Sequence, residues 1–194
     1  MNIFTKIRWV ASILLVFFIV LITNIIDRDN FNRLTNSVKT MFEDRIVASD
    51  LLFDITRIIK EKQIAILTSD TNFFKNQNNK LNQEIDQLLD RYEITKLTEK
   101  EKRHLNLLQE ELKTLKQKEK SDVNLSNGEL IKSIEIIDEQ LYKLSKIQLQ
   151  EGKEQVLISN KAKDTINLYT QGEIIFLIIM AVLVQIIILY KPKE

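Results

Sequence analysis

Arg45 has the position and the chemistry of a residue that could hold an anion. It occupies an apolar position of a long helical repeat, as Lys62 does further along. Counting equal distances from the two apolar ends of the chain brings Arg45 level with Glu154, with Glu151 one helical turn away. Two interpretations follow. Arg45 forms an internal ion pair with these carboxylates that fixes helix alignment, or it grips a small anionic ligand through two parallel hydrogen bonds.

The stretch from Glu101 to His104 contains a second pattern with chemical meaning. Glu-x-x-His is the spacing of metal ligands in di-iron helical bundles. Those sites use two such motifs, however, and His104 is the only histidine in the chain. A solvated helix face near a helix start is the better interpretation, so we expect no metal and no other cofactor.

The composition does not favour an enzyme or a nucleic-acid-binding protein. The 194 residues include no cysteine, three glycines and one proline, which leaves no thiol nucleophile and few places for a phosphate-binding loop. The net charge is +1, so no basic surface for nucleic acid is expected. The sequence therefore predicts a protein without catalytic residues.

Gln185 is the strongly polar residue within an apolar segment near the end of the chain, and Ala181 lies one helical turn before it. A buried amide seeks a partner, and a small neighbour allows another helix to come close. This pair predicts a contact with the first apolar segment or with a second copy of the chain. A docking face for a separate signalling protein is the alternative.

Two apolar segments, 9–26 and 173–190, define the organisation of the chain. Each approaches the roughly 20 residues that a membrane-spanning helix needs. Lysines and arginines outnumber acidic residues in the short tails, 1–8 and 191–194, and positive charge favours the cytoplasmic side. We therefore expect a membrane-embedded protein with both termini in the cytoplasm and residues 27–172 outside it.

The region 27–172 has the apolar spacing of four helices, at about 27–68, 72–95, 99–120 and 128–172. Capping boxes begin the last two, at Thr98–Glu101 and Ser126–Glu129. The predicted fold is all-α: a membrane-anchored, antiparallel, up-down four-helix bundle. Its first and last helices continue into the two transmembrane helices.

The first and last of these helices are longer than the second and third. In their membrane-proximal halves they therefore pack only against each other. An apolar stripe on the first helix would lie exposed there, and exposed stripes of this kind mark interaction surfaces. We therefore predict a parallel homodimer, although a misplaced helix boundary would also explain the pattern. The stripe consists of Phe31, Leu34, Val38, Met41 and Phe42.

The segment Met41–Val47, followed by Leu51, Leu52 and Ile55, resembles the four-helix-bundle sensory domain of methyl-accepting chemotaxis receptors. In that family an aromatic residue and then an acidic-Arg-aliphatic stretch recur partway along the first outer helix. Ala48 departs from the pattern, because members often have proline there. The resemblance implies a sensor in the bacterial inner (plasma) membrane with its bundle in the periplasm, involved in chemotaxis or related signal transduction.

The resemblance also leads to an expectation about how the protein would pass on a signal. Family members continue beyond the second span into coupling and signalling modules, whereas this sequence ends four residues after Tyr190. We therefore expect a sensor module that signals through a partner membrane or signalling protein. A structural or accessory subunit of a larger membrane complex is the alternative.

Overall fold

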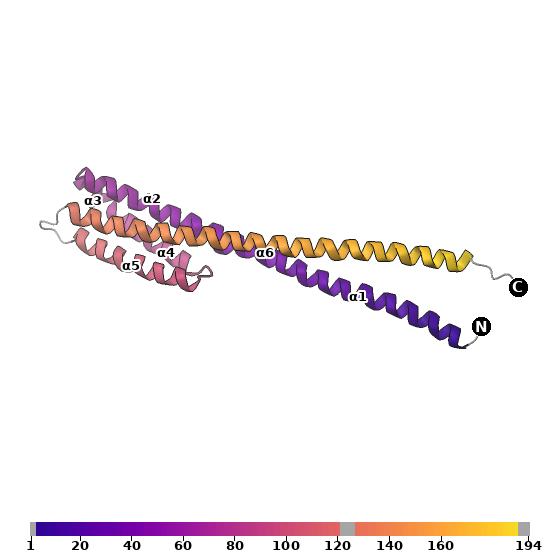
Figure 1. Cartoon of the computed structure of the whole chain (residues 1–194). Coiled ribbons are helices and arrows are strands. Elements are labelled where there is room, and N and C mark those ends of the chain that lie inside the picture. Colours follow the sequence, from indigo (N-terminus) through magenta and orange to yellow (C-terminus); the bar gives the residue numbers. More distant parts are fainter. Residues whose placement is uncertain (1–2, 121–126, 190–194) are drawn as a thin grey trace. The chain divides into compact units, whose positions relative to one another are not determined.

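The computed structural model describes residues 3–120 and 127–189, and nearly all of them are helical. The prediction of an all-α protein is confirmed (Figure 1). In chain order the elements are α1 (Ile3–Thr40), the π-helix η1 (Met41–Ile46), α2 (Val47–Leu67), α3 (Thr71–Asn76), α4 (Asn78–Glu93), α5 (Glu99–Lys120) and α6 (Asn127–Leu189).

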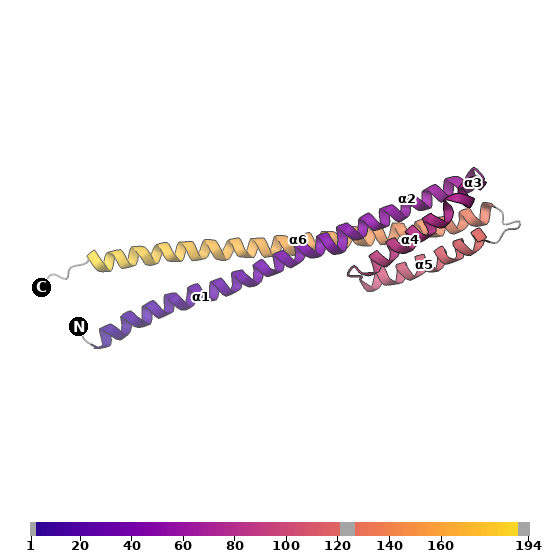
Figure 2. The same cartoon turned by 180° about the vertical axis from the view of Figure 1, so that it is seen from behind.

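The described chain forms two compact units. The first consists of α1 up to Val38 together with α6 from Val156 onwards. The second runs from Lys39 to Gln155 and holds η1, α2, α3, α4, α5 and the start of α6. Within this second unit the four long helices run antiparallel beside one another, as both views show (Figures 1 and 2). The predicted four-helix bundle is thus present.

The core of the second unit follows from the apolar spacing of its four helices. Side chains three and four residues apart lie on one face of each helix and meet on the bundle axis. The buried cluster consists of Ala48, Leu51, Leu52, Ile55, Ile58, Ile59, Ile66, Ile85, Leu88, Leu89, Tyr92, Leu105, Leu108, Leu112, Leu115, Ile134, Ile137, Leu141 and Leu144.

Two connections of the bundle are closed by local hydrogen bonds. After α2 the N–H of Ser69 donates to the carbonyl of Ile66 and the N–H of Asp70 to that of Ala65, which is the Schellman arrangement. The predicted capping box at Thr98 is present, because the N–H of Thr98 donates to Glu101 Oε2 (2.6 Å) and the N–H of Glu101 to Thr98 Oγ1 (3.3 Å). The predicted box at Ser126 falls outside the described residues.

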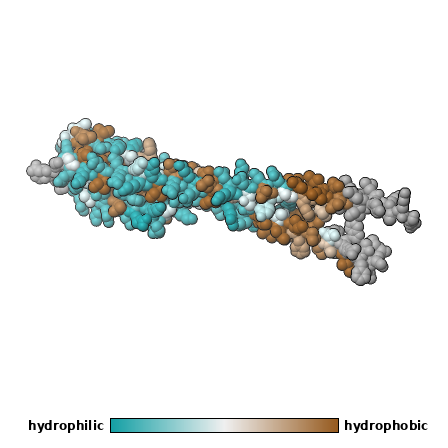
Figure 3. Space-filling model, in the orientation of Figure 1, coloured by the Kyte–Doolittle hydropathy of each residue, from teal (hydrophilic) through white to brown (hydrophobic). Residues whose placement is uncertain are grey.

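The first unit exposes many apolar side chains, and hydrophobic surface gathers over its described part in Figure 3. On α1 they include Leu14, Leu15, Phe17, Phe18, Leu21, Ile22 and Ile25, and on α6 they include Ile174, Ile175, Leu177, Ile178, Ile179, Val182 and Leu183. No helix, over the residues that the structure describes, has an apolar stretch of the length that crossing a membrane requires. The predicted transmembrane helices are therefore not supported by the structure.

Part of the apolar stripe predicted on the first helix is exposed. Phe31 and Val38 are 62% and 54% exposed, whereas Asn30 and Ser37, each one residue earlier, are buried, as is Ala162 of α6. The spacing of seven residues is the same in both pairs, so periodicity alone did not distinguish the two faces. Of the other stripe residues, Phe42 is 60% exposed, and Leu34 and Met41 are half-buried.

Candidate functional site

A buried polar layer crosses the bundle at Arg45, with one side chain from each of the four helices. The Nη1 atom of Arg45, in η1, lies 2.9 Å from Glu101 Oε1 of α5 and donates to Gln148 Oε1 of α6 at 3.2 Å. The side-chain amide of Gln148 in turn donates to Glu101 Oε1 (2.6 Å) and to the hydroxyl of Tyr92 on α4 (2.9 Å). The layer therefore ties all four helices together at one level.

The connection between α4 and α5 positions this layer. Arg45 Nη2 donates to the carbonyl of Lys96 (3.1 Å), and the N–H of Lys96 donates to Asp44 Oδ1 (3.0 Å). Both backbone groups of one loop residue are thus bound by two consecutive residues of the π-helix. Glu101 joins this arrangement from the capping box of α5, because its second carboxylate oxygen accepts the N–H of Thr98.

The layer lies almost entirely out of water. Arg45 is 5% exposed and Glu101 is fully buried. Burial raises the pKa of the Tyr92 phenol above its ordinary range, which outweighs the opposing hydrogen bond from Gln148. Both terminal nitrogens of Arg45 already have protein acceptors, and only its Nε lacks one. This geometry favours an ion pair that fixes helix alignment over a pocket for an anionic ligand.

The partners of Arg45 differ from those predicted. Glu151 is half-buried, Glu154 is exposed, and neither forms an ion pair with Arg45 among the described residues. Glu101 supplies the carboxylate instead, and Gln148, one turn before Glu151, supplies the contact from α6. Equal counting assumes that both apolar segments begin at one level and that both helices rise equally, and the π-helical turn that contains Arg45 accounts for only about one residue of the difference between Glu154 and Gln148.

A second buried layer surrounds Lys62, the other charged residue at an apolar position. Lys62 Nζ lies 2.8 Å from Glu119 Oε1 and also donates to Asn78 Oδ1, and its side chain is fully buried. The amides of Asn78 and Asn82 donate to Glu119 Oε2 at 2.9 and 3.1 Å. Burial lowers the pKa of Lys62, and attraction to Glu119 opposes that shift. Sequence reasoning found Lys62 but not its partners, because they come from other helices.

His104 is not arranged as a metal ligand. Its Nδ1 lies 2.9 Å from Gln140 Oε1 on α6, and Glu101 of the same motif turns instead towards Arg45. Across residues 3–120 and 127–189 no group of histidine, cysteine, aspartate or glutamate side chains is spaced to hold a metal ion.

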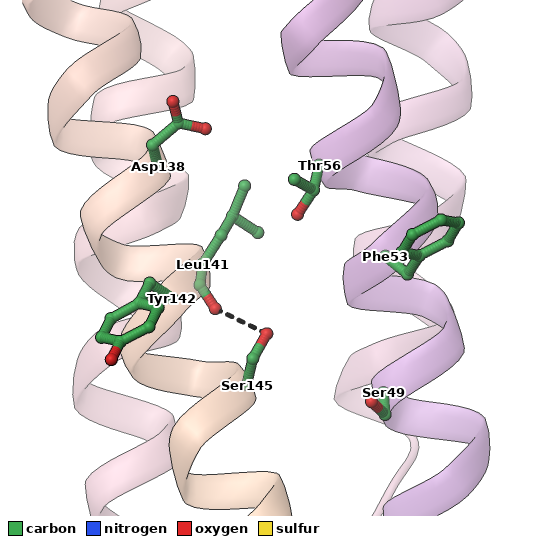
Figure 4. A pocket seen from close by; sticks show the side chains of 7 residues that line it. All are labelled: Ser49, Phe53, Thr56, Asp138, Leu141, Tyr142 and Ser145. Atoms are coloured by element: carbon green, nitrogen blue, oxygen red, sulfur yellow. Dashed lines mark hydrogen bonds between the residues drawn. The ribbon is translucent and has the colours of Figure 1, made fainter.

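A groove of about 320 Å³ lies between α2 and α6 on the surface of the bundle (Figure 4). Thr56 and Leu141 point towards its middle, whereas Phe53 and Tyr142 point outwards along its two edges. The hydroxyl of Ser145 is used locally, because it donates to the carbonyl of Leu141 (2.9 Å). The groove offers apolar edges and few free polar groups. Its lining is Ser49, Phe53, Thr56, Asp138, Leu141, Tyr142 and Ser145.

Ala181 and Gln185 both lie in α6, but their side chains fall outside the described residues. Their predicted helix contact therefore stays a prediction.

Comparison with known families agrees with this architecture. The family model of a four-helix-bundle sensory module for signal transduction, from chemotaxis receptors, matches residues 1–162. The chain belongs to this family. No curated protein and no solved structure matches the sequence. The family match covers the whole bundle and extends into the first unit, so the resemblance noted at Met41–Val47 is confirmed.

Proposed function

We propose that this chain is a membrane-anchored, extracytoplasmic sensor module of the chemoreceptor type that signals through a partner membrane protein. The observation that carries the proposal is the family match over residues 1–162, together with a four-helix bundle that holds two layers of buried, paired charges. The family's modules are sensors, and this bundle has the same helical order.

Membrane anchoring is supported by the apolar surface of the first unit. The exposed side chains between Leu14 and Ile25, and between Ile174 and Leu183, have few neighbours to bury them within the unit. Lipid would cover such surface at no cost to solubility. The positive charge of the tails supports a topology with both termini in the cytoplasm of a bacterium and the bundle in the periplasm, across the inner membrane.

A parallel homodimer is supported by the exposed side chains of Phe31, Val38 and Phe42. They recur at four- and seven-residue intervals on one helical face, as knobs of a coiled coil do. A second copy of the chain in parallel orientation would present the same face and remove this surface from water.

Signal transfer in this proposal is a small helix movement. Binding of a ligand or partner would favour a position of α6 that is shifted by about 1–2 Å, which is the usual scale of helix shifts in switching proteins. The buried layers suit this role, because paired charges tolerate few alternative alignments and so make the movement discrete.

An accessory subunit of a membrane complex is the second candidate, and one observation favours it. The bundle core is filled with aliphatic side chains, while Phe53 and Tyr142 stand 68% and 62% exposed at the edges of the α2–α6 groove. A scaffold needs an exposed apolar surface and no ligand cavity.

Purification of the full chain in a native-membrane polymer, followed by mass spectrometry, distinguishes the two candidates. Stoichiometric recovery of a kinase, a receptor or a transducer supports the sensor. Recovery of a transporter or secretion complex contradicts it and supports the accessory subunit. A thermal-shift screen of small anionic molecules on the same sample then tests for a ligand.

A further inference from the structure

The bundle carries a second, outward seam along η1 and α2, one residue after the buried seam. Ile46 and Phe53 are 54% and 68% exposed, and the smaller Ser49 and Thr56 alternate with them at steps of three and four residues. This is the spacing of the contact positions of a coiled coil. All four residues belong to the second unit, so the seam lies within one compact body.

The seam borders the groove between α2 and α6 (Figure 4). Ser49 and Thr56 line the α2 side on either side of Phe53, and Tyr142 forms the opposite edge. A surface that holds a large side chain between small ones is suited to pack against a copy of itself. A two-fold axis brings the Phe53 ring of each chain to the small side chains of the other. A second copy of the chain therefore fits this groove.

The α6 edge of the groove continues as an exposed stripe of alternating charged and apolar side chains. Its members are Glu139, Tyr142, Lys146 and Leu149, again at steps of three and four residues. The flank of α2 that faces away from this stripe carries exposed Asp50 and Arg57, seven residues apart. In a parallel two-fold pair, that flank of one chain lies over the α6 stripe of the other.

The charges on these two surfaces match in sign. Within the bundle Arg45 is bonded to Gln148, and Lys60 is paired with Asp138. Because α2 and α6 run antiparallel, counting between these contacts sets Lys146 near the level of Asp50, and Glu139 near that of Arg57. Each position of the flank therefore meets the opposite charge.

We propose that a second copy of the chain covers the α2–α6 groove, with α2 packed against α2 and Asp50 of each copy facing Lys146 of the other. The inference rests on the parallel homodimer proposed above and names the face of the bundle that forms it. Burial of Ile46 and Phe53 supplies the attraction, and the charges at the rim fix the alignment.

Asp50 and Lys146 are the pair on which this alignment depends most. Arg57 already pairs with Glu61 at 2.9 Å, and Glu139 with Lys143 at 2.6 Å. Asp50 forms no ion pair within the part of the chain that the structure describes. Lys146 lies over the ring of Tyr142, with Nζ 5.4 Å from the ring centre.

Disulfide formation between single cysteines tests the interface, because the chain has no native cysteine. In the full chain in a native-membrane polymer, Ser49→Cys and Thr56→Cys should each form a disulfide-linked dimer on mild oxidation, since both positions lie beside the two-fold axis. Gln87→Cys, on the exposed surface of α4, is the matched control and should stay largely unlinked. Circular dichroism checks that each variant keeps its helical fold.

Reversal of charge tests the alignment in the Thr56→Cys chain. Asp50→Lys and Lys146→Glu should each slow cross-linking severalfold, because like charges then face each other, and the two changes together should restore the rate. Asp90→Lys makes the same change on exposed α4 and should leave the rate unaltered.

The outcomes separate this interface from the homodimer itself. A dimer by light scattering that cross-links at neither 49 nor 56 would overturn the interface and leave the homodimer standing, whereas a monomer would overturn both. Cross-linking of Gln87→Cys at the same rate as the other two would reveal random collision and contradict the interface. A doubly reversed chain that stays as slow as the single variants would show that Asp50 and Lys146 do not meet.

Discussion

Arg45 and Lys62 are charged side chains placed where the helical repeat calls for apolar ones. Each is buried, and each has a carboxylate from α5 within 2.9 Å. Transfer of such pairs out of water costs about as much as their attraction returns, so they add little to net stability while strongly disfavouring misaligned states. At the residue scale, both layers therefore disfavour arrangements of the four helices in which these charges lose their partners.

Removing one partner of the Arg45 layer should be far more harmful than removing both. Arg45→Met leaves Glu101 buried without its cation, which should lower the free energy of unfolding by roughly 3–5 kcal/mol. Denaturant unfolding of the full chain, followed by circular dichroism, measures this change. Arg91→Met on exposed α4 surface is the control and should change stability little.

Adding Glu101→Gln to Arg45→Met should recover much of that loss. Glutamine keeps the capping-box hydrogen bond to Thr98 and carries no charge that needs a partner. A double variant no more stable than the single one would contradict the assignment of Glu101 as the partner of Arg45.

Tyr92 should make stability depend on pH above its ordinary pKa of 10.0. Burial raises the pKa of the folded state, so the folded chain keeps a proton that the unfolded chain releases. This contribution is complete below pH 10 and is lost as the pH rises above it. The fall in unfolding free energy between pH 9.5 and 11 (about the accessible window) should be shallower in Tyr92→Phe than in the unaltered chain. Parallel curves would refute the buried position of the phenol.

At the scale of elements, the end of α2 carries a residue in a conformation that suits glycine. Ser69 has φ 52°, and it is the C′ residue of the Schellman arrangement. Ser69→Gly should therefore raise the free energy of unfolding by about 0.5–1 kcal/mol, since glycine adopts this conformation without steric cost. Thr68→Gly, at a position with φ −89°, should destabilise the protein and serves as the control. Thermal melts measure both changes, and a Ser69→Gly variant that melts no higher than the unaltered chain would contradict the prediction.

At the scale of the whole molecule, the proposed dimer predicts an effect of charge on the exposed stripe. Val38→Glu should convert a dimer of the full chain to a monomer, because it would bury like charges opposite each other in a parallel pair. Asn36→Glu, on another exposed face of α1, should leave the dimer intact. Light scattering in a native-membrane polymer measures the mass. A monomer before any substitution would rule out the parallel dimer.

The amino-acid sequence by itself determined the helical class, the four-helix order, the capping box at Thr98 and the family. These depend on local periodicity and on short motifs, and both involve residues that are close together in the sequence. It also singled out Arg45 and Lys62 as charges at apolar positions. Only the tertiary structure decided which carboxylates they meet, because Glu101 and Glu119 belong to another helix and their selection depends on three-dimensional alignment.

The same limit explains the seam of α1. Asn30 with Ser37, and Phe31 with Val38, have the same seven-residue spacing, and hydrophobicity alone favours burying the second pair. The structure buries the first pair instead. Within the first unit the helix has a single rotational setting, and that setting exposes Phe31 and Val38. Rotation about a helix axis is a property of packing, so it is absent from any pattern read along a single chain.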